Sequence, residues 1–159
     1  MAGVSVKRSL FKTFLNTGTT GSPVWSIIGD GVASAQIDYN PSTSEETYID
    51  QDTATILVER YAPKMPIEAT AKNTDVAFEW IDTLRKARGV GSTAETEIVN
   101  VWMYETGGPS AYPAEKQPVS VQIDSFGGEG GTMTKINYTI NFRGNPTTGT
   151  FNGSTLAFT

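Results

Sequence analysis

The amino-acid sequence predicts a mainly β fold: two packed antiparallel sheets, as in a β-sandwich or barrel, with one flanking α-helix and extended N- and C-terminal arms. Several segments alternate apolar and polar residues with period two, which is typical of half-buried strands. The 16 glycines and 8 prolines separate these segments, as expected of short strands joined by turns. One segment has the apolar stripe of an amphipathic helix. A length of 159 residues fits a single domain of this kind.

The expected organisation is an N-terminal arm and linker over residues 1–23, a β domain over 24–143 and a C-terminal arm over 144–159. The linker is the breaker-rich segment 18–23. Residues 1–29 contain three basic side chains and no acidic one, so they carry +3, and the net charge of −5 leaves −8 for the rest. Lys12 interrupts the apolar residues of the arm, which therefore lacks the hydrophobic core of a secretion signal.

Two strands and a loop are expected in the first part of the domain. Segment 24–28 is apolar, and Gly29-Asp30-Gly31 closes it. Segment 34–39 alternates and ends at Asn40-Pro41, because proline cannot donate to a sheet ladder. Residues 41–47 are polar and predict a loop.

Segment 53–61 has period two, with Ala54, Ile56 and Val58 on one side. This pattern predicts a strand with one clearly buried face. A short strand follows, with Ile67, Ala69 and Ala71 on one face.

A helix is expected over about residues 74–88. Asn73 or Thr74 supplies an N-cap, and Gly89 can take the left-handed conformation that ends a helix. The apolar stripe consists of Val76, Ala77, Trp80, Ile81 and Leu84. The basic side chains of the last turns complement the helix dipole.

Three long strands are expected to complete the domain, over 96–104, 119–126 and 133–142. In the last one, even-numbered residues form an apolar face and odd-numbered residues a polar face. The glycine-rich segment 127–131 lies between two strands and predicts a hairpin turn. A phosphate-binding loop would instead lead into the N-terminus of a helix.

Composition argues against catalysis and against several kinds of binding site. Cysteine and histidine are absent, which removes disulfides, thiolate chemistry and imidazole chemistry. We therefore expect no enzymatic activity, no cofactor and no metal; Asp50 and Asp52 start like a calcium loop but lack its glycine and closing glutamate. The acidic balance argues against a general nucleic-acid binder. No segment has the ~18 uninterrupted apolar residues of a membrane span, so no membrane binding is expected.

Ordered fragments from about residue 20 onward resemble siphophage major tail proteins, the phage tail tube family. The fragments are Trp25-Ser-Ile-Ile-Gly-Asp-Gly-Val32, Asp38-Tyr-Asn-Pro41, Thr47-Tyr-Ile-Asp50, Glu97-Ile-Val-Asn-Val101, Tyr112-Pro-Ala-Glu115, Val119-Ser-Val-Gln-Ile-Asp124, Phe126-Gly-Gly-Glu-Gly-Gly131 and Gly144-Asn-Pro-Thr-Thr-Gly-Thr-Phe151. The N-terminal arm matches this family less distinctively.

The resemblance implies a structural subunit of the phage virion whose fold is shared with type VI secretion tube proteins. Six copies would join edge to edge into a ring, and rings would stack around a tape measure protein, between a distal tail protein and a tail terminator. The tube would assemble in the host bacterial cytoplasm and would conduct DNA without binding it specifically. Ring closure would also satisfy the strand edges that a lone β-sandwich exposes.

Candidate contacts between subunits are the apolar residues of the two arms and the glycine-rich hairpin: Leu10, Phe11, Phe14, Leu15, Gly128, Glu129, Gly130, Phe151 and Phe158. If the basic arm docks on an acidic neighbour, deletion of residues 2–18 should stop polymerisation and leave a folded monomer. Candidate lumen-facing acids, which would repel phosphate, are Glu59, Glu97 and Asp124.

Other functions remain open at this point. The chain could be a type VI secretion-like tube subunit or another virion β-protein such as a decoration protein. It could also be a monomeric β-barrel with an apolar ligand cavity, or a hydrolase with two acids converging in a cleft.

Overall fold

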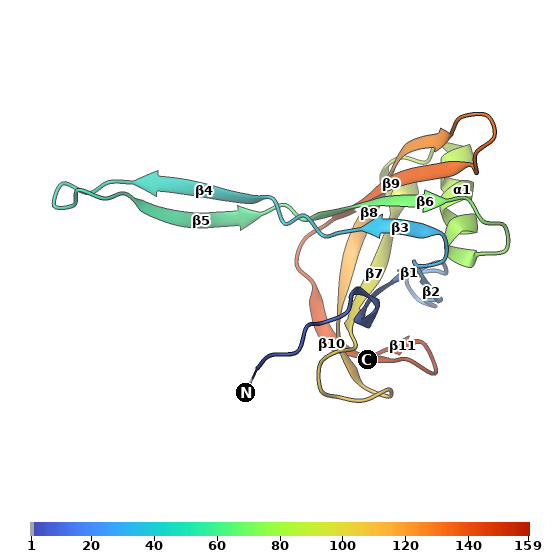
Figure 1. Cartoon of the computed structure of the whole chain (residues 1–159), viewed down its shortest axis with the longest axis horizontal. Helices are drawn as coiled ribbons and strands as arrows, with labels where there is room; N and C mark the ends of the chain where they lie inside the picture. The colour runs from blue at the N-terminus through green and yellow to red at the C-terminus, as the bar shows by residue number, and fades with distance from the viewer. Residues whose placement is uncertain (1) are drawn as a thin grey trace.

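The computed structural model describes residues 2–159, and β-strands dominate this part of the chain (Figure 1). The elements in chain order are η1 (Arg8–Leu10), β1 (Phe11–Asn16), β2 (Trp25–Ile27), β3 (Val32–Ala35), β4 (Pro41–Glu46), β5 (Thr55–Tyr61), β6 (Lys64–Thr70), α1 (Val76–Ala87), η2 (Gly91–Ala94), β7 (Glu95–Trp102), β8 (Tyr112–Gly127), β9 (Lys135–Phe142), β10 (Thr147–Asn152) and β11 (Ala157–Phe158). The prediction of a mainly β fold with one flanking α-helix is confirmed.

Nine strands form one antiparallel sheet that curls on itself (Figure 1). Its main order is β2-β1-β7-β8-β9-β6-β3, and β10 attaches to β8 and carries β11. The 16-residue strand β8 changes partners along its length. It pairs first with β10, then with β7 and finally with β9. Because β8 changes partners, β10 and β11 can cover one face of β1 and β7.

The larger core lies between one face of the sheet and α1. Leu15, Ile98 and Ile140 from three strands pack in the same cluster as Ile81 of α1, and all four are fully buried. Burial of each such side chain contributes about 1.5–3 kcal/mol. This core therefore fixes the position of α1 on the sheet.

A second core lies on the opposite face of β1 and β7. Phe14, Val99 and Phe151 are buried there, and the ring centroids of Phe14 and Phe151 are 4.5 Å apart. Successive side chains of a strand point to opposite faces. Because Phe14 and its neighbour Leu15 are both buried, β1 is covered on both sides.

The structure corrects the expected boundaries of the two arms. Residues 11–16 form a strand that pairs with β7 and β2, and residues 147–152 form a strand that pairs with β8 and β11. Residues 2–7 precede η1 and are exposed. Both expected arms therefore contribute strands to the chain's own sheet.

The helix lies where the sequence predicts it, with different caps. The Asp75 carboxylate, rather than Asn73 or Thr74, accepts a hydrogen bond from the Phe78 N–H at 3.2 Å. Burial raises the pKa of the Asp75 carboxyl, and this effect exceeds the opposing effect of that hydrogen bond. At the other end Arg88, rather than Gly89, adopts the left-handed conformation with φ of 47°.

Residues 41–46 form a strand rather than the expected polar loop. This strand, β4, pairs with β5 in a separate two-stranded sheet. Pro41 is tolerated because it is the first residue of a strand in a two-stranded sheet. The β4–β5 hairpin projects far from the rest of the chain (Figure 1).

The other strands agree with the sequence apart from their ends. The three long strands at 96–104, 119–126 and 133–142 correspond to β7, β8 and β9, although β8 begins seven residues earlier, at Tyr112. The strand expected over 34–39 ends at Ala35, and Asp38 forms only an isolated bridge with Lys64. Segment 128–134 connects β8 to β9, where the sequence predicts a hairpin turn.

Candidate assembly surfaces

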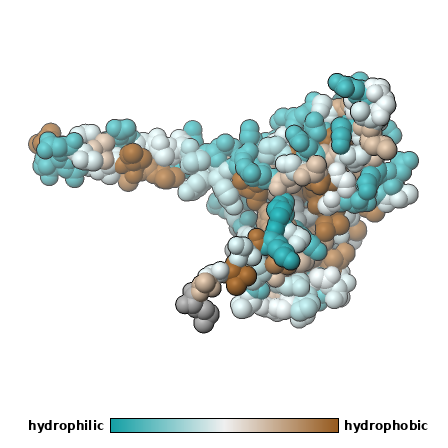
Figure 2. Space-filling model, viewed as in Figure 1, coloured by the Kyte–Doolittle hydropathy of each residue, from teal (hydrophilic) through white to brown (hydrophobic). Residues whose placement is uncertain are grey.

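The β4–β5 hairpin exposes apolar side chains to solvent on both faces. Ile56 is 64% exposed, Val58 is 55% exposed and Leu57, on the other face, is 50% exposed; Ile49 at the tip is fully exposed. Figure 2 shows apolar side chains along this projection. The face of β5 that the sequence predicts to be buried is thus not buried within the chain. The prediction of a strand was right, and the prediction of its burial within the same chain was wrong.

The hairpin also carries most of the net charge. Residues 41–61 contain five acidic side chains and Arg60, which gives −4, whereas the whole chain carries −5. Four of the acids surround the tip: Glu45, Glu46, Asp50 and Asp52. The Tyr48 hydroxyl donates a hydrogen bond to the Glu46 carboxylate at 2.7 Å, and this bond raises the pKa of Tyr48.

The two legs of the hairpin are joined at its base, next to the isolated bridge between Asp38 and Lys64 of β6. The side chain of Asn40 donates hydrogen bonds to the backbone carbonyls of Asp38 and Ala62, at 3.2 and 3.1 Å. The rings of Tyr39 and Tyr61 meet edge-on with centroids 6.3 Å apart. These contacts join the two legs of the hairpin where it leaves the body.

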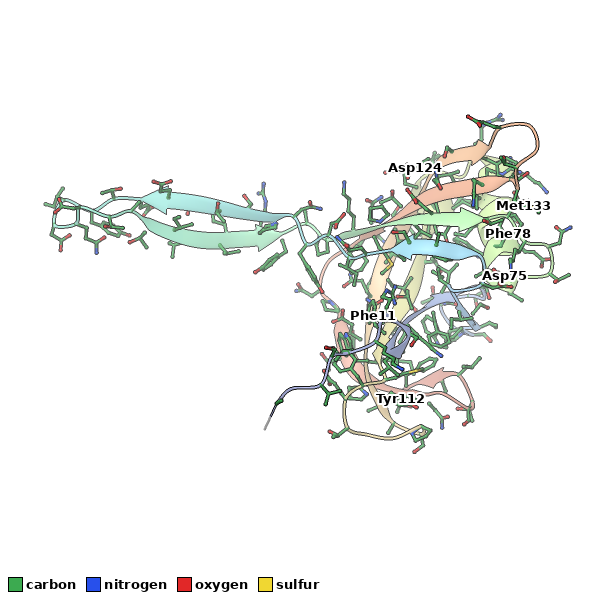
Figure 3. All side chains as sticks on the ribbon, viewed as in Figure 1. Phe11, Asp75, Phe78, Tyr112, Asp124 and Met133 are labelled. Carbon is green, nitrogen blue, oxygen red and sulfur yellow. The ribbon has the colours of Figure 1, made fainter. Side chains whose placement is uncertain are left out.

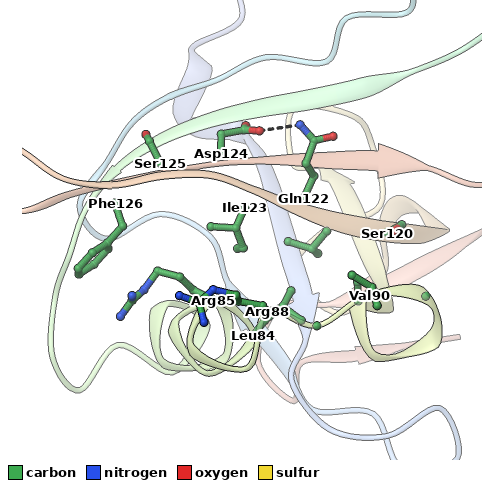
Figure 4. A pocket seen from close by; sticks show the side chains of 14 residues that line it. Leu84, Arg85, Arg88, Val90, Ser120, Gln122, Ile123, Asp124, Ser125 and Phe126 are labelled. Carbon is green, nitrogen blue, oxygen red and sulfur yellow. Dashed lines mark hydrogen bonds between the residues drawn. The ribbon is translucent and has the colours of Figure 1, made fainter.

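A groove of about 620 Å³ lies between the C-terminal end of α1 and the second half of β8 (Figure 4). Arg85, Arg88 and Val90 line one side, and Ile123 and Phe126 line the other. The Arg85 guanidinium lies over the Phe126 ring, 3.8 Å from its centroid. The groove therefore combines an apolar lining with a cationic rim.

Asp82 positions two of the cations at this end of α1. It pairs with Arg85 at 2.7 Å and with Lys86 at 2.9 Å. Burial acts to raise the pKa of Asp82, but the hydrogen bonds from Lys86 and Arg85 outweigh it and hold the pKa below its usual value. Arg88 has no ion-pair partner within residues 2–159.

The outer face of β8 and β9 is polar and internally hydrogen-bonded. The Asp124 carboxylate accepts hydrogen bonds from the Gln122 amide at 2.6 Å and the Thr139 hydroxyl at 2.7 Å. The Asn141 amide lies 3.4 Å from Gln122 Oε1. Figure 3 labels Asp124 on the sheet, and Figure 4 shows it on the side of β8 that faces away from α1.

Three of the candidate subunit contacts are part of the chain's own core. Phe14, Leu15 and Phe151 are buried by neighbouring strands, so they cannot anchor an arm on another copy, and this expectation is corrected. Leu10 and Phe11 are partly exposed beside η1, and Arg8 fastens this segment through hydrogen bonds to the carbonyls of Phe11 and Ala35.

The other candidate contacts remain accessible. Gly128, Glu129 and Gly130 are exposed in the β8–β9 turn. Phe158 of β11 is half-buried, with the Lys116 ammonium 5.5 Å from its ring centroid.

The three lumen candidates lie on three different surfaces. Glu59 is on the projecting hairpin, and Asp124 is on the polar face of β8. Glu97 is on β7, on the side of Val99, which packs into the second core. A single subunit therefore does not bring them together on one wall.

No groups of three or more acidic residues suited to a metal ion occur within residues 2–159. No helix in that range is long and apolar enough to cross a membrane.

Sequence reasoning missed the hairpin as a functional element because residues 41–47 are rich in Ser, Thr and Glu, which are typical of loops. The hairpin could have been found by asking whether this polar segment can pair, in antiparallel register, with the alternating strand that follows it. Residues 41–46 pair in order with residues 55–61.

Solved structures share this fold. A chain of the tail of an empty GTA particle with C6 symmetry superposes with a TM-score of 0.64, at 15% identity over 90% of this chain and 98% of that chain. A chain of the six-fold symmetrised baseplate of the anti-feeding prophage (AFP) superposes with a TM-score of 0.51, at 10% identity over 97% and 99% of the two chains. No protein-family model and no curated protein matches the sequence. The chain therefore has a fold that occurs in six-fold symmetric tail and baseplate particles.

Proposed function

We propose that this chain is a structural subunit of a bacteriophage tail tube, which assembles into stacked hexameric rings and conducts DNA into the host. The observation that carries the proposal is the β5 face formed by Ile56 and Val58. Its sequence has the pattern of a buried face, yet Ile56 is 64% exposed and Val58 is 55% exposed in the single chain. A second copy of the chain is the partner that would bury this face.

The isolated hairpin itself supports assembly. A two-stranded hairpin is marginally stable at best in water without packing against other elements. Among residues 2–159 no third strand pairs with the hairpin, and its apolar side chains contact solvent on both faces. Docking on a neighbouring subunit would provide the missing packing. The hairpin thus replaces the N-terminal arm as the proposed connection between copies.

The hexameric state is proposed from the symmetry of the particles that share this fold. The sheet ends in short edge strands, β2 and β3, and pairing with neighbours in a closed ring would cover such edges. The subunit would perform no catalysis. Its proposed partners are a tape measure protein, a distal tail protein and a tail terminator, in a virion assembled in the host cytoplasm.

The polar face of β8 and β9 is the proposed lumen wall, and Asp124 is the lumen candidate that best fits it. Short amide and hydroxyl side chains on this face hydrogen-bond to one another rather than presenting donors to a ligand. Tight phosphate contacts require free Lys and Arg. The two cations in line with this face are engaged within the chain, because Lys135 donates a hydrogen bond to Thr70 and Arg143 pairs with Glu95, so such a wall would let DNA pass.

Electron microscopy of the purified protein at increasing concentration tests the proposal. We expect rings and long tubes with six-fold symmetry from the natural sequence. We expect monomers when residues 42–60 are replaced by a two-residue turn, with unchanged thermal unfolding of the sheet. A protein that stays monomeric at millimolar concentration would contradict the proposal.

A second candidate is a baseplate-type subunit that forms rings but not long tubes, and it is favoured by the likeness to the AFP baseplate chain. The same images distinguish the two. Isolated rings that never stack would support the second candidate.

A further inference from the structure

We propose that the groove between α1 and β8 is the receptor for the β4–β5 hairpin tip of a second copy of this chain. This inference rests on the proposed self-assembly and specifies which two surfaces meet.

The groove runs along an open side of a strand. On one side, β8 pairs with β7 as far as Ser120. On the other side, β8 pairs with β9 from Val119 onward. From Val121 to Gly127 only β9 pairs with it among the described residues. Residues 88–91, which follow α1, line the groove together with this stretch of β8, and an extended segment can add to a strand edge that has no partner.

The lining of the groove suits a segment that is both apolar and acidic. Val90 and Phe126, which are 81% and 46% exposed, provide apolar surface together with the partly buried Ile123, and Figure 4 labels all three. The end of α1 contributes Asp82, Arg85, Lys86 and Arg88, with a net charge of +2. Arg88 is the cation there without an ion-pair partner within residues 2–159.

The hairpin tip has the complementary chemistry. Ile49 is fully exposed, and four carboxylates surround it within residues 45–52. The other extended segment with exposed apolar residues is 2–7, which contains Val4 and Val6. That segment leads into Lys7 and Arg8, so the cationic rim would repel it. Charge therefore favours the hairpin tip as the occupant.

Geometry requires that the tip come from another copy. The hairpin leaves the body on the side away from α1 (Figure 1). From Asn40 to Asp50 it extends about 34 Å at ~3.4 Å per residue. A body of ~140 residues is itself about 35 Å across. The tip thus extends to the distance of an adjacent subunit and away from its own groove.

Cysteine cross-linking tests this pairing without background, because the natural chain has no cysteine. The double variant Ile49→Cys, Val90→Cys would be co-assembled with natural subunits and treated with a short bismaleimide. We expect covalent dimers and higher ladders in assembled material only. The matched control is Ile49→Cys, Val76→Cys, since Val76 is also exposed but lies at the opposite end of α1. We expect at least tenfold less cross-linked product from it.

Charge exchange gives an independent readout. Arg88→Glu should raise the concentration needed for assembly by about tenfold, and Asp50→Lys with Asp52→Lys should restore most of the loss. Circular dichroism of each monomer checks that it is folded. Tubes that form without the Ile49–Val90 cross-link, or an Arg88→Glu protein that assembles normally, would overturn the groove as receptor and leave the tube function standing. A natural chain that never assembles would overturn both.

Discussion

The exposed face of β5 gives the sharpest quantitative prediction. We consider the double variant Ile56→Thr, Val58→Thr, which keeps β-branched side chains and therefore the strand propensity of the hairpin. Ile56 and Val58 are 64% and 55% exposed in the single chain, so assembly can still bury most of their apolar surface. Burial of an aliphatic side chain contributes about 1.5–3 kcal/mol. The double variant loses the apolar burial that Ile56 and Val58 would gain on assembly, and it must also desolvate two hydroxyls. Together these effects should weaken the free energy of assembly by about 2–3 kcal/mol per subunit.

This cost should appear in assembly and not in folding. A change of about 2–3 kcal/mol corresponds to a roughly 30- to 150-fold higher critical concentration. Sedimentation of tubes across a concentration series measures it. The matched control is Val24→Thr. Val24 is 54% exposed, a fraction similar to that of Val58, but it lies outside the hairpin. A double variant whose critical concentration rises less than threefold would refute the argument that this face is buried by a partner.

Three further predictions follow from other parts of the structure. Phe151→Ala should lower the free energy of unfolding of the monomer by about 3–5 kcal/mol in denaturant titrations, because Phe151 is fully buried against Phe14; a cost below 1 kcal/mol would contradict its place in the core. Asp82→Asn should cost about 0.5–1 kcal/mol at pH 7. Since the pKa of Asp82 is lowered in the folded chain, this stabilisation is fully present above the unfolded pKa and is lost as the pH falls through the folded pKa. In denaturant titrations the difference between the two proteins should therefore begin to shrink near pH ~3.9 and vanish only at a pH below the folded pKa. Deletion of residues 2–18 should unfold the monomer, because it removes β1, whereas deletion of residues 2–6 should leave the thermal unfolding midpoint unchanged; circular dichroism checks both, and a folded protein lacking 2–18 would show that β1 is dispensable.

Period-two patterns predicted the strands that have one face in the core. In β9, Ile136, Tyr138 and Ile140 are buried, while the polar residues between them lie on the other face, although Thr139 is also shielded. The helix could be predicted for the same reason, because Ala77, Ile81 and Leu84 of its apolar stripe face a single core, although Val76 of the predicted stripe is exposed.

The missed strands lack that simple alternation. In β1, Phe14 and Leu15 are adjacent and both buried, because one side of the strand packs toward α1 and the other toward β10. A strand buried on both faces has no period of two. The strand β10 was missed because its sequence, Thr-Thr-Gly-Thr-Phe-Asn, is that of a loop. A Cβ atom at Gly149 would meet the Phe158 ring at 2.6 Å, so glycine is required where β11 approaches.

The candidate contacts could be predicted only in part for a related reason. Sequence shows that Phe14, Phe151 and Ile56 are apolar, but it does not show which of them the chain itself buries. The single chain covers the first two and leaves Ile56 exposed. Apolar contacts between copies were therefore expected near the ends of the chain, whereas the unburied apolar face lies in the β4–β5 hairpin.

Hydrogen–deuterium exchange of the backbone amides tests most directly whether the chain buries its hairpin on another copy. Exchange would be compared between the monomer and the assembled particle under the same buffer. We predict that amides of residues 53–61 exchange at least tenfold more slowly after assembly, because the hairpin gains packing on both faces. Equal exchange rates for this segment in monomer and assembly would contradict the account.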